Sequence, residues 1–206
     1  MTFSKQDVEA VLNKVKLRLS SKRFLHTVGV VRAAEALSML CIPDSIYELC
    51  VAAALHDVAK EYDTAAQLKI IRERCIPITS DDEMSPAVLH SYAAVAVIDD
   101  DFSEYATENV KSAVYNHTVG SPDMTVFDEI IFLADYIEET RKYESCVSLR
   151  NKVFSSMKAG EYDSNIRLLH TFCIEAISNT YKCLVERKSH VNSKMLLTAN
   201  ALKCKI

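Results

Sequence analysis

Glycine and proline are scarce in this sequence, with 3 Gly and 4 Pro among its 206 residues. Folds built from many short strands need tight turns, and glycine and proline concentrate in tight turns. The scarcity therefore argues against such folds and favours long helices with few connections. The length suits one domain with a terminal extension. We expect an all-α protein.

An excess of positive charge is also missing. The formal net charge is -4, and the sequence has no run of Lys and Arg with interleaved aromatic residues. Nothing in this composition attracts a polyanion over a whole face, so we expect no nucleic-acid partner. A phosphate-rich ligand would have to be received locally, by metal ions, a few Lys or Arg side chains, and helix N-termini.

Signals for export and for disulfide pairing are absent as well. Residues 1–7 lack the apolar stretch of a signal peptide, and we see no segment that approaches the roughly 18 apolar residues of a membrane span. The seven cysteines are odd in number and contain no C-x-x-C pair, which is typical of reduced thiols. We therefore predict a cytoplasmic protein with no membrane partner.

Apolar residues recur at helical spacing along most of the chain. Capping signals predict helix starts at Ser4, at Asp44-Ser45, at Thr64 with Gln67, and at Thr125 with Asp128. The helices expected from these patterns cover about residues 4–19, 22–40, 44–55, 64–74, 87–98, 104–117 and 126–141, with a polar loop over 78–86. From about residue 143 a further helical stripe predicts a structural extension that packs on the domain or forms a dimer contact.

Four histidines lie among small or apolar neighbours on successive predicted helices: His26, His56, His90 and His117. Two acids accompany them, since Asp57 follows His56 and Asp135 lies in the apolar run 132–137. Burying an unpaired carboxylate in such a run is costly, and a metal ion would remove that cost. Imidazole and carboxylate together suit Fe, Mn and Zn, and the core of a helical bundle can bring them together.

A single histidine in such a place is more often a hydrogen-bonded core residue than a ligand. The ordered combination of all six residues is what favours a metal site. His170 and His190 lie in the extension and have no acidic neighbour in the sequence that suggests a site.

The order of these residues is similar to the H…HD…D signature of HD-domain phosphohydrolases, through His26, His56-Asp57 and Asp135. His90 and His117 resemble the additional ligands of the subset that binds two metals. The strings RFLHTVGV (23–30), HTVGSPDM (117–124) and LADYIE (133–138) resemble the YqeK-type symmetrical dinucleoside tetraphosphatases, over about residues 22–141. Where that family usually has a Gly-containing turn of helix after His90, this chain has Ser91-Tyr92-Ala93.

The resemblance implies an HD-domain helical bundle over residues 1–142, with a C-terminal helical extension over 143–206. It also implies a di-iron centre and hydrolysis of diadenosine tetraphosphate to two ADP. One metal would be held by His26, His56, Asp57 and Asp135, and the other by His90 and His117, with Asp57 bridging both. Iron is what the resemblance implies, whereas the ligand types alone also allow manganese, cobalt or zinc.

Two cations are candidates for the catalytic set beside Asp57. Lys60 lies one helical turn beyond His56, and Arg23 lies three residues before His26, so each shares a face with a predicted ligand. We predict that both bind the substrate and meet the negative charge that develops on it, although each could instead be a solvated surface cation.

Residues near the predicted ligands complete the substrate-binding set. His90, Thr118 and Gly120 are predicted to contact the substrate, the last two through a hydroxyl and a close backbone approach. The alternative for Thr118 and Gly120 is a helix C-cap and turn. Arg141 is either a phosphate contact or a favourable cation at a helix C-terminus, and we leave it outside the catalytic set.

Other functions remain open on the sequence alone. The same site could belong to an HD-type nucleotidase acting on mononucleotides or deoxynucleoside triphosphates, although His90 and His117 argue against it. A regulatory nucleotide-binding module is expected to lack a ligand, and none is missing. A purely structural helical protein would leave Asp57 and Asp135 without partners. A homodimer through the extension or a domain face is possible.

Overall fold

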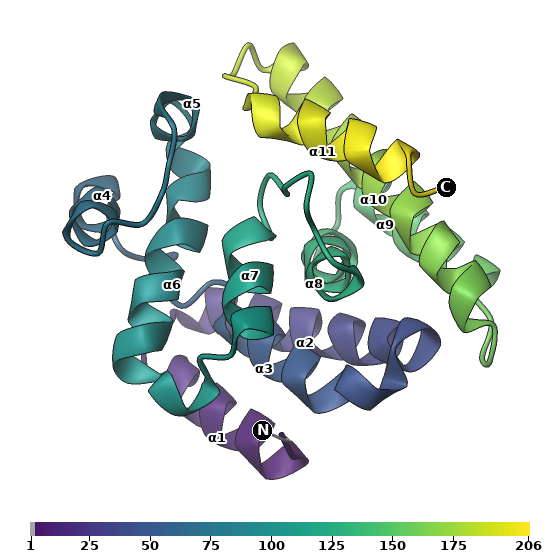
Figure 1. The fold of residues 1–206 in the computed structure, drawn as a ribbon, viewed down its shortest axis with the longest axis horizontal. Helices are drawn as coiled ribbons and strands as arrows, with labels where there is room; N and C mark the ends of the chain where they lie inside the picture. Colours follow the sequence, from purple (N-terminus) through teal and green to yellow (C-terminus); the bar gives the residue numbers. More distant parts are fainter. Residues whose placement is uncertain (1–2) are drawn as a thin grey trace.

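The computed structural model describes residues 3–206, and these residues form α-helices, short 3-10 helices and no strand, which confirms the all-α prediction (Figure 1). The α-helices are α1 (Lys5–Lys16), α2 (Ser21–Cys41), α3 (Ile46–Leu55), α4 (Thr64–Glu73), α5 (Ser80–Glu83), α6 (Leu89–Asp101), α7 (Glu108–Asn116), α8 (Val126–Ile137), α9 (Glu144–Ser156), α10 (Tyr162–Glu186) and α11 (Ser193–Lys203). The 3-10 helices are η1 (Pro43–Ser45), η2 (Pro86–Val88) and η3 (Ser103–Tyr105).

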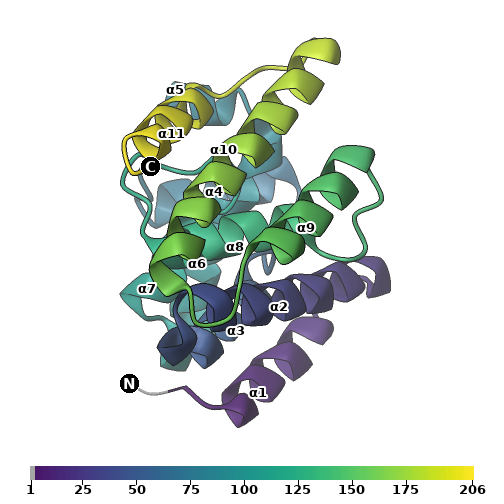
Figure 2. The ribbon, with the colours of Figure 1, turned by 90° about the vertical axis from the view of Figure 1, so that its right-hand side faces the viewer.

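Helix α8 occupies the centre of the molecule and is seen end-on in Figure 1. Helices α2 and α3 pack together on one side of α8, with α1 beneath them, and α7 contacts both α3 and α8. Helix α10 crosses α8 on the opposite side, and both α9 and α11 pack against α10 (Figure 2). Because α8 is buried on all these sides, its residues from Ile130 to Ala134 are almost entirely inaccessible to solvent.

One apolar core runs through the whole chain. Val11 of α1, Leu149 of α9, and Leu169 and Phe172 of α10 belong to the same buried cluster as the residues of α2, α3 and α8. The extension from residue 143 therefore packs directly on the core helices. The boundary at residue 142 stays a prediction, because the core is continuous across it.

Two of the predicted helix caps are present and two are wrong. Ser4 with Asp7 and Thr125 with Asp128 form capping boxes at the starts of α1 and α8. Asp44-Ser45 instead belongs to η1, and no side-chain cap bond precedes α3. The cap of α4 is Asp63, whose carboxylate accepts from the amide of Ala66 at 2.8 Å.

Gln67, which we expected in a capping box, has a different role. Its side-chain amide donates to the carbonyls of Ala59 and Tyr62, at 3.1 and 2.9 Å. These bonds fix the tight turns of residues 56–62 that follow α3. The predicted cap partner therefore stabilises the segment that carries the His-Asp pair.

Three boundaries differ from the periodicity-based predictions. The loop expected over 78–86 contains the short helix α5, which is capped by Thr79 and Asp82. The helix expected over 104–117 is divided into η3 and α7. Helix α8 ends at Ile137 rather than at residue 141, because the Glu138 carboxylate accepts the amide and hydroxyl of Thr140, both at 2.6 Å, and the backbone leaves the helix there.

Helix α2 is more apolar than the sequence analysis recognised. By length and composition alone it could cross a membrane, since an 18-residue window of it has a mean hydropathy of 1.3. However, 56% of that window is buried inside the fold, and the helix carries His26. Its apolar composition is therefore accounted for by its position in the core.

The C-terminal segment is joined to the core by contacts with a buried carboxylate. Glu129 of α8 is fully buried, and its carboxylate contacts Nδ1 of His170 at 2.6 Å and Nζ of Lys205 at 3.0 Å. The fold thus supplies His170 with an acidic partner that is remote in sequence. His190 likewise lies against Asp81.

A second charged cluster joins the start of α11 to α5. The buried carboxylate of Asp82 accepts hydrogen bonds from Lys194 Nζ at 2.7 Å, from Tyr92 Oη at 2.8 Å and from Asn192 Nδ2 at 2.9 Å. Tyr92 is part of the sequence that departs from the family pattern after His90. Burial alone would raise the pKa of the Asp82 carboxyl, but the bonds from Lys194 and its other donors outweigh burial and lower the pKa to about 2.

We expect Asp82→Asn to lower the free energy of unfolding by about 2 kcal/mol at pH 7. The folded-state pKa of Asp82 lies below its ordinary value of 3.8, so its contribution is present above about pH 4. It disappears as the pH falls toward 2. Urea unfolding between pH 2 and 7 measures this, with Asp123→Asn, an exposed change, as the control. Equal unfolding free energies of the two variants at pH 7 would contradict the assignment.

Candidate active site

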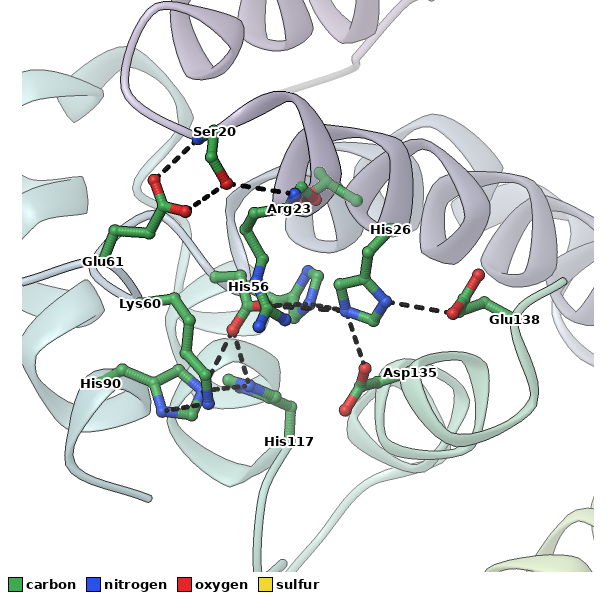
Figure 3. Close-up of polar contacts among 12 residues, drawn as sticks. Ser20, Arg23, His26, His56, Lys60, Glu61, His90, His117, Asp135 and Glu138 are labelled. Atoms are coloured by element: carbon green, nitrogen blue, oxygen red, sulfur yellow. Dashed lines mark hydrogen bonds and ion pairs between the residues drawn. The ribbon is translucent and has the colours of Figure 1, made fainter. Parts of the chain in front are cut away.

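The six predicted metal ligands lie close together, although they come from five helices. Figure 3 shows the four histidines and Asp135 of this site. The six residues are His26 in α2, His56 and Asp57 directly after α3, His90 in the first turn of α6, His117 directly after α7, and Asp135 in the last turn of α8. Most of these side chains come from the ends of their helices. The side chains can therefore meet in one space that the helices themselves do not fill. The structure therefore brings all six side chains together, and their role as metal ligands stays a prediction.

Asp57 lies at the centre, and its two carboxylate oxygens face different partners. Oδ2 lies 3.5 Å from Nε2 of His26 and 3.4 Å from Nε2 of His56. Oδ1 lies 3.1 Å from Nε2 of His90 and 3.9 Å from Nε2 of His117. Asp135 joins the first pair, with Oδ1 at 3.0 Å from Nε2 of His26. One carboxylate thus divides the site into two halves with two histidines each.

The outer nitrogen of three of these rings is engaged by a hydrogen-bond acceptor. Nδ1 of His56 donates to the carbonyl of Ala53 at 2.7 Å, and Nδ1 of His117 donates to that of Val114 at 2.6 Å. Nδ1 of His26 faces the carboxylate of Glu138 at 3.2 Å. A proton on Nδ1 leaves the Nε2 lone pair free, and ligating histidines are commonly oriented in this way.

The inner nitrogens consequently face one another. Nε2 of His26 lies 3.3 Å from Nε2 of His56, and Nε2 of His90 lies 3.1 Å from Nε2 of His117. Two unprotonated nitrogens at this separation, with carboxylate oxygens beside them, would be unfavourable without a positive charge between them, which either a proton or a metal ion can supply. The donor set is therefore compatible with bound divalent metal ions.

The pKa directions show which groups carry charge. Burial lowers the pKa of His117 to about 3, so a proton does not supply positive charge on that side near neutral pH. Burial alone would raise the pKa of Asp57, but its histidine partners outweigh this and hold the pKa well below 3.8. Asp135 is held well below 3.8 in the same way, chiefly by Arg141. Both carboxylates are ionised.

The pair of His26 and His56 differs from the pair of His90 and His117 in the pKa of one member. Burial lowers the pKa of His26, but hydrogen bonds with Asp135 and Glu138 outweigh it and raise the pKa to about 9. These two carboxylates therefore favour positive charge at this end of the site. A proton and a metal ion compete for Nε2 of His26.

Three cations lie at the rim of the site. Arg23 Nη1 contacts Oδ2 of Asp57 at 2.8 Å, and Arg141 Nη2 contacts Oδ1 of Asp135 at 2.7 Å. Lys60 Nζ lies 3.2 Å from Nδ1 of His90, and burial lowers its pKa. Arg141, which the sequence analysis left outside the catalytic set, holds a position equivalent to that of Arg23. All three are partly exposed and so available to a ligand.

The site opens into a cavity of about 480 Å³, within the size range of small-molecule sites. Beside the metal-site residues, α8 contributes Phe132 and Tyr136 to its wall, and α10 contributes Asn179, Leu184 and the following Arg187. Such a wall combines apolar and aromatic surface with a few polar groups. The extension therefore helps to form the site, which its apolar stripe did not indicate.

The two remaining predicted substrate contacts lie in different places. Thr118 lines the cavity, and its hydroxyl is 3.3 Å from that of Ser91. Gly120 does not line it. Gly120 has a φ of +75°, and a Cβ there would lie 2.6 Å from Cγ2 of Thr198, so this position serves a turn packed against α11. Its contact with substrate stays a prediction.

Sequence reasoning missed Glu138 and the cavity residues of the extension. A Glu two residues before a Thr at a predicted helix end could have signalled that the chain turns at 138. The polar residues of α10 carried no signal, because helical periodicity identifies only the face that is buried.

Residues 23–140 match the family model described as HD domain. This chain belongs to the HD-domain family. The chain is also 30% identical over 194 residues to a symmetrical bis(5'-nucleosyl)-tetraphosphatase of Bacillus subtilis (strain 168), covering 94% of this chain and 96% of that protein. A protein of the same name from Halalkalibacterium halodurans is 28% identical, covering 93% and 94%. The resemblance predicted from the sequence is confirmed.

A solved structure supports the fold of this HD-domain protein. It is a predicted HD superfamily hydrolase involved in NAD metabolism from Clostridium acetobutylicum, and it matches with a TM-score of 0.82. The match covers 99% of this chain and 100% of the other at 21% identity. The extension is thus included in the shared fold.

We expect Glu138→Gln to weaken divalent metal binding by about 10- to 100-fold, since it removes the charge that orients His26. Metal titration followed by calorimetry measures this. Glu139→Gln is the matched control, because Glu139 is the adjacent residue and its carboxylate pairs on the surface with Arg32. Unchanged affinity in Glu138→Gln would show that the carboxylate does not support the site.

A substitution at Gly29 also tests whether Glu138 orients His26, because Gly29 lies against Glu138. A Cβ at Gly29 would lie 2.4 Å from Oε2 of the buried Glu138 carboxylate. Gly29→Ala should therefore displace Glu138 and reproduce the loss of metal affinity. Gly160→Ala should leave the affinity unchanged, because a Cβ there meets no other atom and the strain at a φ of +83° is confined to the turn before α10. Equal affinities in the two variants would contradict this packing argument.

Proposed function

We propose that this protein hydrolyses dinucleoside tetraphosphates symmetrically, converting diadenosine tetraphosphate and water into two ADP. Two relatives that align over almost the whole chain carry the name of this activity. The observation that carries the proposal is the central Asp57, which has a pair of inward-facing imidazoles on each side and opens into a nucleotide-sized cavity. Water attacks one inner phosphorus, the bond from that phosphorus to the central bridging oxygen breaks, and one ADP leaves with that oxygen. The attacked half keeps the hydroxyl of the water as the second ADP, and the remaining proton of the water is released to solvent.

The cofactors that we propose are two divalent cations, with iron as the first choice and manganese, cobalt and zinc as metals that the same ligands accept. His26, His56 and Asp135 would hold one, His90 and His117 the other, and Asp57 would bridge. Such a pair supplies an activated water and neutralises charge on the phosphate. The proposal rests on the facing Nε2 atoms, which need positive charge between them.

Arg23, Lys60 and Arg141 are proposed to bind the inner phosphates. Each lines the cavity and lies beside a ligand, at Asp57, His90 and Asp135 respectively. Positive groups held in place before the reaction stabilise the charge that develops on the phosphoryl oxygens. Lys60 is additionally desolvated, which strengthens its interaction with an anion that replaces water.

One nucleoside is proposed to lie in the cavity between α8 and α10. Phe132, Tyr136 and Leu184 offer surface against which a base and ribose can pack, and Asn179 offers an amide that can bond either. Thr118 and His90 lie at the phosphate end of this cavity. The extension would then contribute to nucleoside recognition.

We propose the cytoplasm as the site of this reaction. All seven cysteines are free thiols, including the exposed Cys75 and Cys204, and free thiols are typical of a reducing compartment. The homodimer stays a prediction.

Asp57→Ala tests the proposal as a whole. The wild-type protein, purified without oxygen, should contain close to two metal ions per chain and should produce ADP alone from diadenosine tetraphosphate. Asp57→Ala should lose both properties because it removes the shared ligand, whereas Asp123→Ala, an exposed control, should retain them. ATP plus AMP as products would contradict symmetrical cleavage. Turnover of mononucleotides or deoxynucleoside triphosphates instead would favour an HD-type nucleotidase.

Lys60→Met tests the role of the buried cation. We expect kcat to fall by about 100-fold, the order found when one charge-stabilising donor is removed, while the metal content is retained. Lys69→Met on the surface of α4 is the control, because its ammonium lies near Glu73 in solvent. A wild-type kcat in Lys60→Met would exclude Lys60 from the catalytic set.

A further inference from the structure

A second cavity, of about 690 Å³, adjoins the metal site on the side away from α10. It lies between the start of α2 and the loop that follows α8. Its charged lining residues are Lys22, Arg23, Glu61, Glu138, Arg141 and Lys142. The space beyond His26, Arg23 and Arg141 has no role in the proposed catalytic chemistry.

The two cavities share Arg23, Arg141 and Tyr143. The metal site therefore has an opening on each side of the arginine pair. In Figure 3, Arg23 lies between Ser20 and Glu61 on one side and Lys60, His90 and His117 on the other. His26, whose Nε2 faces Asp135 and Asp57, reaches the second cavity as well.

The charge of the second cavity suits an anion. Four cations line it against two carboxylates, and both carboxylates are engaged. Glu61 accepts the amide and hydroxyl of Ser20, and Glu138 accepts Thr140 and contacts His26. Lys142 donates only to the carbonyl of Glu139, and among the described residues no carboxylate pairs with Lys22. These two ammonium groups are exposed and available.

The symmetry of the reaction requires two half-sites. When the two inner phosphates lie at the metal site, one outer phosphate and its nucleoside extend from the site in each of two directions. The cavity between α8 and α10 takes one of these ends. The second cavity can take the other because it shares both arginines with the first, whereas a mononucleotide would need no second cavity.

We infer that the cavity between α2 and the 138–143 loop binds the other outer phosphate and nucleoside of the substrate, with Lys22 and Lys142 contacting that phosphate. The inference rests on the proposed function. The second cavity would favour a dinucleotide over a mononucleotide, because only a dinucleotide fills both cavities. Tyr143, which lies between the two cavities and is exposed, offers a ring on which a base can stack.

The test compares Lys22→Ala/Lys142→Ala with Lys5→Ala/Lys203→Ala, a control that removes the same charge from exposed positions elsewhere. Each metal-loaded protein is titrated with ADP in a calorimeter and assayed with diadenosine tetraphosphate. We expect two ADP per chain in the wild type and the control, and one in the Lys22/Lys142 variant. The KM for diadenosine tetraphosphate should rise about tenfold or more in that variant, as expected for a loss of about 1.4 kcal/mol.

The outcomes separate the inference from the proposed function. A single ADP per chain in the wild type, or the same KM in the variant and the control, overturns the second half-site while leaving symmetrical hydrolysis intact. Absence of diadenosine tetraphosphate hydrolysis by the wild type overturns the function. The ADP stoichiometry then still decides whether the second cavity binds a nucleotide.

Discussion

The structure depends on one electrostatic constraint, which is that four imidazoles and two ionised carboxylates share a small buried space around Asp57. Their Nε2 atoms face inward at separations of 3.1 and 3.3 Å, so the site favours the presence of positive charge. Helices α2, α3, α6, α7 and α8 are arranged so that ends rather than middles surround this space. The ends bring the side chains close without filling the volume that a ligand must enter.

The backbone around the site supplies hydrogen-bond acceptors that orient the imidazole rings. His56 and His117 each donate to a carbonyl three residues earlier, in the final turns of α3 and α7, and those final carbonyls have no partner further along their helices. His26 has no such carbonyl and uses Glu138 instead, which is reachable only because α8 ends at Ile137. Gly29 leaves the space that this carboxylate occupies. The ends of α3 and α7 thus orient the rings of His56 and His117. The termination of α8 at Ile137, together with the space left by Gly29, orients the ring of His26.

How much the sequence could predict depended on the kind of interaction. The six candidate ligands could be singled out because each is a polar residue in an apolar run, where burial without a partner would be costly. Glu138 could not be singled out, because the periodicity of α8 continues past Ile137 and the turn arises from bonds between Glu138 and Thr140. Arg141 was a candidate phosphate contact, but its contact with Asp135 depends on the same turn. The cap at Thr64 failed for a related reason, since Asp63 competes for the same amides. The cavity residues of α10 lie beside its apolar stripe, and only the packing of α10 across α8 shows that they face the site.

The position of the cations resolves an apparent conflict between an acidic protein and a substrate with four phosphates. The net charge of -4 gives no attraction over the whole surface. The positive side chains that line the two cavities are nevertheless gathered beside the histidine and aspartate cluster: Arg23, Lys60, Arg141, Lys22, Lys142 and Arg187. The acids near them are engaged, Asp57 and Asp135 with the arginines and Glu138 with His26. A field confined in this way favours a short, dense polyphosphate over an extended polyanion such as DNA, because only a compact ligand can bring all its charges within reach of these groups.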